Sequence, residues 1–265
     1  MKTLTNHTII YDNECPLCNA YTGAFVKTGM LDESGRAAYS EKHHTDTAVN
    51  WERARNEIAL INLADNSVLY GVDSLLRIIG YNMPWVQKIF RIRPLRYLLD
   101  RLYFFISFNR KVIAPGKQFE GQNLCIPDMN YTYRWTYIVF AAGVTSFILN
   151  YYLPMVKYFP PVKYTNLVLG FCGLTLVQGI VVGLTNRRKV IHYLGNMMTV
   201  GLAGSILLSP LMVFKSLIDS NELFTGYLIL IMCLALFEHI RRAKLLELPN
   251  ITSVTWMFYI FAWIL

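Results

Sequence analysis

The chain has 265 residues, of which 54% are hydrophobic and 16% are charged. An ordinary soluble domain carries about a quarter charged residues, so this composition excludes a disordered protein, a collagen and a charged coiled coil. Five cysteines are too few for a secreted scaffold held together by disulfides. Residues 1–133 hold 13 of the 17 acidic residues, and the remainder of the chain holds four. We therefore expect a soluble N-terminal half followed by a membrane half.

The N-terminal half has the pattern of a small α/β domain. Apolar stretches bounded by turn residues predict strands, and apolar residues at spacings of three and four predict helices. Ala64-Asp65-Asn66 would join the last two strands as a hairpin. The expected strands are 7–11, 36–40, 57–62 and 67–70, and the expected helices run from about 16 to near Gly29 and from 72 to Gly80.

The segment Cys15-Pro16-Leu17-Cys18 lies where the first strand passes into the first helix. Pro16 suits a first helical turn, which places Cys15 at the helix N-terminus, where free N–H groups and the helix dipole favour a thiolate. Such a position can lower a thiol pKa from about 8.5 to about 7 or below. Cys18, one turn further on, can resolve a mixed disulfide by bonding to Cys15. The pair predicts disulfide exchange without a cofactor or a metal.

Asp12 precedes Cys15 by three residues and has two possible roles. Its carboxylate could take or give a thiol proton during exchange, which would require a pKa raised by partial burial. Alternatively, it could cap the first helical turn or brace the turn by accepting hydrogen bonds from backbone N–H groups. The sequence leaves both roles open.

Residues 11–18, Tyr-Asp-Asn-Glu-Cys-Pro-Leu-Cys, resemble the D-x-x-C-P-x-C signature of the DCC family of predicted thiol-disulfide oxidoreductases. The resemblance continues through 36–40, 57–78, Tyr103 and Asn109-Arg110, and covers about residues 7–113. It implies a thioredoxin-like fold and a redox role for Cys15 and Cys18, with Asp12 as the third signature residue. The chain departs from thioredoxins in having no proline before the strand at 57–62.

Other uses of the cysteine pair stay open. Cys15 and Cys18 could form half of a zinc site with His43 and His44, although Pro16 is unusual in such a site. Haem attachment is excluded because Asn19 stands where C-x-x-C-H needs histidine. The missing proline also allows a non-catalytic assembly or scaffold subunit of a membrane complex, with idle cysteines.

A basic segment precedes the first apolar run. Residues 88–117 hold eight Lys or Arg against Asp100 alone, within a chain of net charge +8. This position favours anionic lipid headgroups over nucleic acid, at up to ~1 kcal/mol per charge. The segment would form interfacial helices broken near Pro94, or the last helices of the soluble domain with a basic face toward lipid. We expect the domain at 1–112 and a linker at 113–133.

The remainder, 134–265, is expected to be an all-α membrane domain of about five helices. A membrane-spanning helix needs about 20 mainly apolar residues, and four runs meet that length. A fifth run, with about 17 residues, is marginal, although Pro249 suits a first helical turn. The runs are 135–153, 164–185, 192–213, 223–240 and 249–265.

Lys and Arg accumulate in the cytoplasmic loops of membrane proteins. Here they cluster at 187–189 and at 241–244, so these loops and the N-terminal domain are expected in the cytoplasm. The first twenty residues also lack a signal-peptide pattern. The sequence therefore predicts a multi-pass protein of the inner membrane that acts on a protein or small dithiol substrate.

Several residues of the membrane half have open roles. Small residues on a helix allow close approach, within the chain or to a membrane-protein partner. Cysteines inside a membrane could relay electrons, but most pack as small apolar residues. Ionisable residues near the cytoplasmic boundary could form a cluster. The small residues are Gly179, Gly183, Gly201, Ala203, Gly204 and Ser205, the cysteines are Cys172 and Cys233, and the ionisable residues are His192, Glu238 and His239; Cys125 of the linker has no assigned role.

Overall fold

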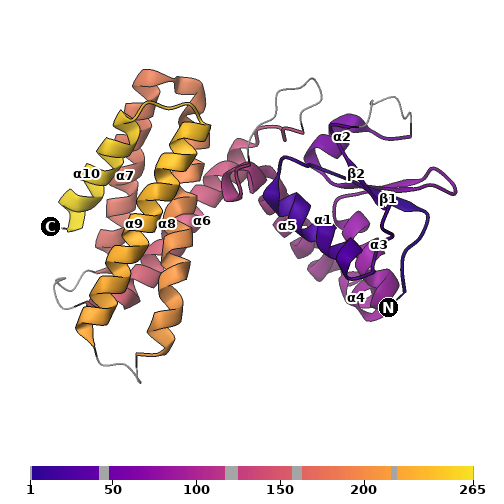
Figure 1. Ribbon diagram of the computed structural model, residues 1–265, viewed down its shortest axis with the longest axis horizontal. Helices are drawn as coiled ribbons and strands as arrows, with labels where there is room; N and C mark the ends of the chain where they lie inside the picture. The colour runs from indigo at the N-terminus through magenta and orange to yellow at the C-terminus, as the bar shows by residue number, and fades with distance from the viewer. Residues whose placement is uncertain (1, 42–47, 117–124, 157–162, 216–219, 265) are drawn as a thin grey trace. The chain divides into compact units, whose positions relative to one another are not determined.

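The computed structural model describes residues 2–41, 48–116, 125–156, 163–215 and 220–264. The chain divides into two compact units, Met1–Tyr133 and Arg134–Leu265. The first unit contains strands and helices, and the described part of the second is helical (Figure 1). This arrangement confirms the predicted α/β domain followed by an all-α part.

A four-stranded mixed sheet with the order β2-β1-β3-β4 forms the centre of the first unit. β1 (His7–Tyr11) pairs in parallel with β2 (Arg36–Ala38) and antiparallel with β3 (Ala59–Asn62). β3 also pairs antiparallel with β4 (Val68–Tyr70). All four predicted strands are confirmed, with ends that differ by one or two residues.

Apolar side chains cover both faces of this sheet. Ile9 and Leu60 lie opposite each other and point into one core, whereas the next pair, Ile10 and Ala59, points into the other. This alternation follows from the two-residue period of a strand. The two strands at the centre of the sheet are therefore buried on both sides.

Five helices complete the first unit, and two of them differ from the prediction. α2 was not predicted, because its sequence WERARN is mostly polar; the side chain of Asn50 caps it by accepting a hydrogen bond from the N–H of Arg53. α3 passes through Gly80 rather than ending there, since that glycine leaves room for the side chain of Gln87. The helices are α1 (Pro16–Lys27), α2 (Trp51–Asn56), α3 (Val72–Asn82), α4 (Pro84–Phe90) and α5 (Arg93–Ile113).

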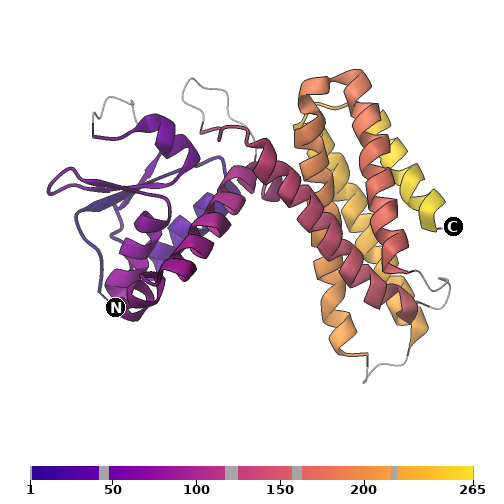
Figure 2. The ribbon, with the colours of Figure 1, turned by 180° about the vertical axis from the view of Figure 1, so that it is seen from behind.

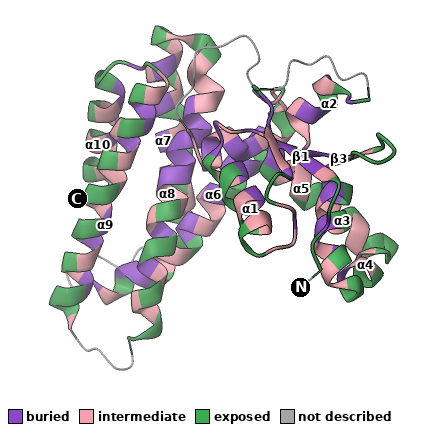
Figure 3. Ribbon diagram, turned by 45° about the vertical axis from the view of Figure 1, so that its right-hand side comes forward, coloured by how far each residue is buried: buried purple, intermediate pink, exposed green. Residues whose placement is uncertain are grey.

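The break near Pro94 is confirmed, because α4 ends at Phe90 and Pro94 lies in the first turn of α5. The last turns of α5 bury Asn109 and Arg110 in the first unit, so α5 belongs to this domain. Figure 3 shows the exposed residues of α4. The exposed surface of the two helices combines cations with large apolar side chains, which suits a lipid headgroup region. The exposed residues include Trp85, Lys88, Arg91, Ile92, Arg93, Tyr97, Leu98, Arg101 and Leu102.

The second unit contains four helices long and apolar enough to span a membrane, among the described residues. Figure 2 shows them from behind. A fifth helix, α10, has only 14 residues and is shorter than the predicted span at 249–265. The structure therefore gives four candidate spans and one shorter apolar helix. The helices are α6 (Tyr131–Tyr152) with η1 (Leu153–Met155), α7 (Tyr164–Thr185), η2 (Arg187–Lys189), α8 (Val190–Val213), α9 (Asn221–Leu245) and α10 (Ile251–Ile264).

Hydrogen bonds between side chains connect four helices of this unit. The hydroxyl of Tyr193 in α8 donates to Oε1 of Gln178 in α7 at 2.8 Å and lies 2.9 Å from Nε2 of His239 in α9. Gln178 and His239 in turn contact Thr255 and Ser253 of α10, at 3.1 and 3.2 Å. The side chains of α10 are thus held to the bundle by polar contacts as well as by apolar packing.

Glu238 and the glycines Gly179 and Gly183 also have partners within the unit. Glu238 pairs with Arg241 and Arg242 of its own helix, each at 2.7 Å. A Cβ atom at Gly179 or Gly183 would lie 3.8–3.9 Å from side chains of α8, so these glycines pack against a neighbouring helix of the same chain. Cys172 and Cys233 are exposed free thiols.

Candidate functional site

Cys15 and Cys18 lie where β1 leads into α1, as the sequence predicts. Cys15 is the N-cap residue of α1, Pro16 occupies the first turn, and the carbonyl oxygen of Cys15 accepts a hydrogen bond from the N–H of Asn19 at 3.0 Å. Both cysteines are free thiols. The sulfur of Cys15 is therefore carried by the residue that begins the helix, where the free N–H groups lie.

The two thiols have different proton affinities. Hydrogen bonds from the side chain and from the backbone N–H of Cys18 lower the pKa of Cys15 to about 6, against the opposing effect of burial. The same side-chain hydrogen bond, together with burial, raises the pKa of Cys18. Cys15 is thus the thiolate of the pair and Cys18 the thiol that donates to it, which is the protonation state that attack by Cys15 requires.

Both sulfurs are covered by protein. Cys15 has no exposed surface and Cys18 is 7% exposed. Gly116, three residues after the end of α5, lies against the residues on either side of Cys15. A Cβ atom there would overlap the carbonyl oxygen of Glu14 and lie 3.2 Å from Cδ of Pro16. Because Cys15 has no exposed surface, a substrate sulfur can reach it only after the local structure opens. No pattern in the sequence indicates that Cys15 is buried.

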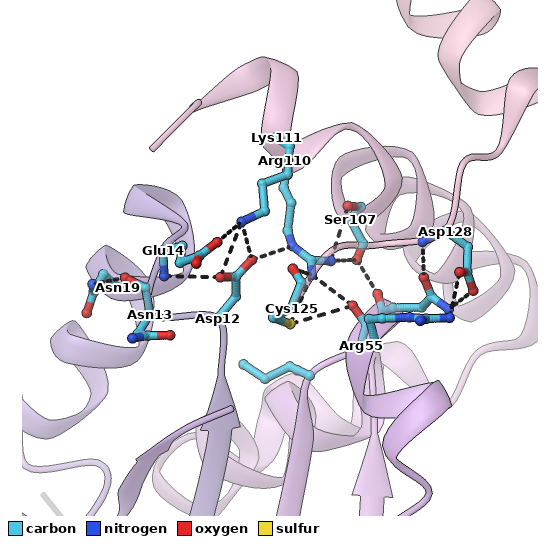
Figure 4. A network of polar contacts seen from close by, with 12 residues as sticks. Asp12, Asn13, Glu14, Asn19, Arg55, Ser107, Arg110, Lys111, Cys125 and Asp128 are labelled. Carbon is cyan, nitrogen blue, oxygen red and sulfur yellow. Dashed lines mark hydrogen bonds and ion pairs between the residues drawn. The ribbon is translucent and has the colours of Figure 1, made fainter. Parts of the chain in front are cut away.

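Asp12 is buried beside the cysteine pair, and its carboxylate makes polar contacts with three residues (Figure 4). Its Oδ1 accepts a hydrogen bond from the N–H of Glu14 at 3.1 Å, which braces the turn before Cys15. Its Oδ2 lies 3.3 Å from Nε of Arg110 and 3.1 Å from Nζ of Lys111. The carboxylate therefore connects the turn at the end of β1 to the end of α5.

Arg110 is the central cation of this site. Its guanidinium donates to the carbonyl oxygen of Arg55 at 2.8 Å and to Oγ of Ser107 at 3.2 Å, and lies 3.4 Å from Sγ of Cys125 (Figure 4). Burial alone would lower the pKa of Arg110, but its electrostatic interactions with the neighbouring acidic groups, Cys125, Cys18, Asp12 and Cys15, raise it. The guanidinium stays protonated, and its charge also lowers the pKa of Cys15.

Lys111 adds a second cation, because its Nζ lies 3.3 Å from Oε2 of Glu14 as well as near Asp12. The prediction that the cations of residues 88–117 face lipid is wrong for Arg110 and Lys111. Both pair with acids 97–99 residues earlier in the chain. The sequence signal for Arg110 was the Asn109-Arg110 ending of the family resemblance, to which no role was assigned.

Cys125 is a buried member of the same site rather than an exposed linker thiol. Burial raises the pKa of Cys125 to about 12, so its thiol stays protonated. Cys18 and Cys125 both line a cavity of about 290 Å³ in the first unit, together with Asp12, Arg110 and Tyr103. The linker is fixed nearby by Asp128, which accepts a hydrogen bond from Arg55 at 2.7 Å. His43 and His44, the other ligands of the zinc alternative, lie outside the described residues.

Residues 9–114, about two fifths of the chain, match the family described as DCC1-like thiol-disulfide oxidoreductase. The matched range includes both cysteines of the pair, Asp12, Arg110 and Lys111. Comparisons with curated proteins and with solved structures give no match to this chain. The membrane unit lies outside the matched range.

Proposed function

We propose, from the family match over residues 9–114, that the first unit exchanges disulfides through Cys15 as nucleophile and Cys18 as resolving thiol. The observation that carries this proposal is the pairing of the two thiols, in which Cys18 donates a hydrogen bond to Cys15 and lowers its pKa to about 6. A thiolate at neutral pH is what attack on a disulfide needs.

The exchange proceeds in two steps after Cys15 becomes accessible. The Cys15 thiolate attacks one sulfur of a substrate disulfide, which forms a mixed disulfide and releases the other substrate sulfur as a thiolate. Cys18 then attacks the sulfur of Cys15, closes the Cys15–Cys18 disulfide and releases the second substrate sulfur as a thiolate, which takes its proton from solvent. The proton of Cys18 passes to the substrate thiolate released first. The substrate is reduced by two electrons, and the pair is oxidised by two.

For Asp12 we propose a positioning role. Its contacts with Arg110 and Lys111 place two cations beside the cysteine pair, and its hydrogen bond to the N–H of Glu14 fixes the turn. A role as acid or base would require the carboxylate to leave these partners. An Asp12→Asn variant should therefore lower the exchange rate. The pH at which the rate is half-maximal should shift only by the effect of removing one negative charge near Cys15.

We also propose that this chemistry takes place on the cytoplasmic side of an inner membrane. The supporting feature is the grouping of cations at η2 and at the end of α9, where Arg187, Arg188, Arg241 and Lys244 are found. Loops rich in Lys and Arg stay on the cytoplasmic side.

Turnover of a disulfide-linked peptide by the full chain in detergent tests the mechanism. Cys15→Ser should abolish turnover, and Cys18→Ser should accumulate the mixed disulfide between Cys15 and the peptide. Cys233→Ser is the matched control, because Cys233 is an exposed thiol of the other unit. Unchanged turnover in Cys15→Ser would refute the mechanism.

The complete burial of Cys15 favours a second function, in which the domain is a non-catalytic assembly subunit. In that case Cys15 should resist alkylation in the native chain for as long as the protein remains folded, while Cys233 reacts. Alkylation of Cys15 well before global unfolding would favour exchange.

A further inference from the structure

The membrane unit contains a second cavity, of about 460 Å³, with walls from α6, α7, α8, α9 and α10. The lining is almost entirely apolar. A space of this size is within the range that binds small lipophilic molecules. The cavity is therefore expected to hold an occupant.

One polar group of the lining lacks a partner. Thr145 of α6 lines the cavity and is 3% exposed, and among the described residues its hydroxyl oxygen makes no hydrogen bond. A buried hydroxyl without a partner is unfavourable, so the occupant should supply one. The other three lining hydroxyls, of Ser205, Thr225 and Tyr259, donate to backbone carbonyl oxygens at 2.9, 2.7 and 2.9 Å.

The space beside this hydroxyl is open because a neighbouring residue is a glycine. Gly201 of α8 also lines the cavity, and a Cβ atom there would lie 3.8 Å from Oγ1 of Thr145 and 3.7 Å from Cε1 of Phe171. The missing side chain opens the space around Thr145 and the ring of Phe171. A polar group of the occupant can therefore approach Oγ1 of Thr145.

The depth of Thr145 limits the chemistry of the occupant. Thr145 is the fifteenth residue of the candidate span Tyr131–Met155, so it lies roughly 15–20 Å from either end at about 1.5 Å per residue. This is near the middle of a hydrocarbon layer about 30 Å thick. A lipid acyl chain carries no hydrogen-bonding atom at that depth. The occupant is therefore a lipophilic molecule with a hydrogen-bonding atom on its buried part.

The aromatic lining favours a flat ring. Trp256 of α10 stacks on His239, with ring centroids 4.6 Å apart and an angle of 16° between the planes. His239 is itself held by Tyr193. Trp256 is therefore a rigid wall of the cavity, and Phe171 and Tyr259 add further ring surfaces. Rings pack well against such surfaces.

We propose that this cavity binds an isoprenoid quinone, with a ring carbonyl accepting a hydrogen bond from the hydroxyl of Thr145. Quinone binding there requires neither Cys15 nor Cys18, so Cys15→Ser should bind quinone as the native chain does. The binding site and the proposed exchange chemistry can thus be refuted separately.

Displacement of a photoreactive azidoquinone from the full chain in detergent micelles tests this assignment. Decylubiquinone should displace the probe at a concentration at least ten times lower than decylbenzene, which lacks the carbonyls, or oleate, which offers an acyl chain. Equal displacement by decylbenzene or oleate would overturn the assignment in favour of a general apolar or acyl-chain site. Labelling that excess decylubiquinone does not displace would also overturn it.

Three variants locate the site. Thr145→Val is nearly isosteric and should raise the displacing concentration of decylubiquinone about tenfold, the value of one hydrogen bond, whereas Thr145→Ser should keep the native value. Gly201→Leu should fill the space and abolish displaceable labelling. Thr175→Val is the matched control, because Thr175 lies in α7 outside the lining and donates to the carbonyl oxygen of Phe171 at 2.7 Å. A native value in Thr145→Val, with an unchanged melting temperature, would overturn the assigned hydrogen bond.

Discussion

Removing the Cys18 thiol should raise the pKa of Cys15, because the side chain of Cys18 is the largest cause of its depression. At a pKa of about 6, Cys15 is about 90% thiolate at pH 7. With the hydrogen bond removed and burial retained, the pKa should return to about 8.5 or above, where only about 3% is ionised. The Cys18→Ala variant is therefore expected to lose about 30-fold in thiolate at neutral pH.

The rate of alkylation at one pH is a poor measure of this change. A thiolate becomes more nucleophilic as its pKa rises, with a Brønsted coefficient of about 0.4–0.5, which would return roughly a factor of 10 of the lost reactivity. Thiolate absorbance near 240 nm avoids this problem and needs no access to the buried sulfur. The difference between each protein and its Cys15→Ser counterpart, titrated with pH, isolates Cys15 from the other four thiols.

Cys18→Ser is the matched control, since its hydroxyl can still donate to Cys15. We expect the Cys15 midpoint near pH 6 in the native chain, above pH 8 in Cys18→Ala, and between these values in Cys18→Ser. A midpoint that stays near pH 6 in Cys18→Ala would refute the assignment of the low pKa to the neighbouring thiol. A native midpoint above pH 8 would remove the basis of the exchange mechanism.

Further expectations concern the cation, the cover and the topology. Arg110→Met leaves the buried Asp12 with Lys111 as its remaining cation, and should lower the free energy of local opening of α5 by about 3 kcal/mol. Hydrogen exchange of α5 peptides in the intact chain measures this free energy, and unchanged protection would contradict the expectation. The valine side chain of Gly116→Val cannot fit against Glu14, so this variant should speed alkylation of Cys15 at least about tenfold. The matched control is Gly226→Val, because Gly226 has open space around it. Equal alkylation rates in the two variants would show that Gly116 does not help to bury Cys15. A cysteine introduced as Arg187→Cys should react with a membrane-impermeant maleimide only after the inner membrane is permeabilised, and labelling of intact cells would reverse the proposed orientation.

The features predicted well from the sequence are those determined by neighbouring residues. Adjacent apolar residues such as Ile9 and Ile10 mark a strand with both faces buried, and Cys15-Pro16 marks a helix start. Gly80 was misinterpreted because a helix end and a close approach to Gln87 both call for glycine. A local pattern cannot distinguish these two requirements.

The features that the sequence missed depend on contacts between distant residues. Arg110 meets Asp12 across 98 positions, and a cation in a basic amphipathic helix gives no sign of whether it faces lipid or a buried acid. The burial of Cys15 also involves a distant segment, since Gly116, about a hundred residues later, packs against its neighbours Glu14 and Pro16. The cysteine pair could therefore be identified from the sequence, whereas its electrostatic surroundings and its accessibility could not.

The polar contacts between α10 and the rest of the bundle affect how the membrane unit assembles. The side chains of Ser253 and Thr255 lie 3.2 and 3.1 Å from those of His239 in α9 and Gln178 in α7. These hydroxyls find their partners only after α7 and α9 have come together. We therefore expect α10 to join the bundle last during biogenesis, so that a defect in α7 or α9 would leave α10 of newly made chains open to quality-control proteases.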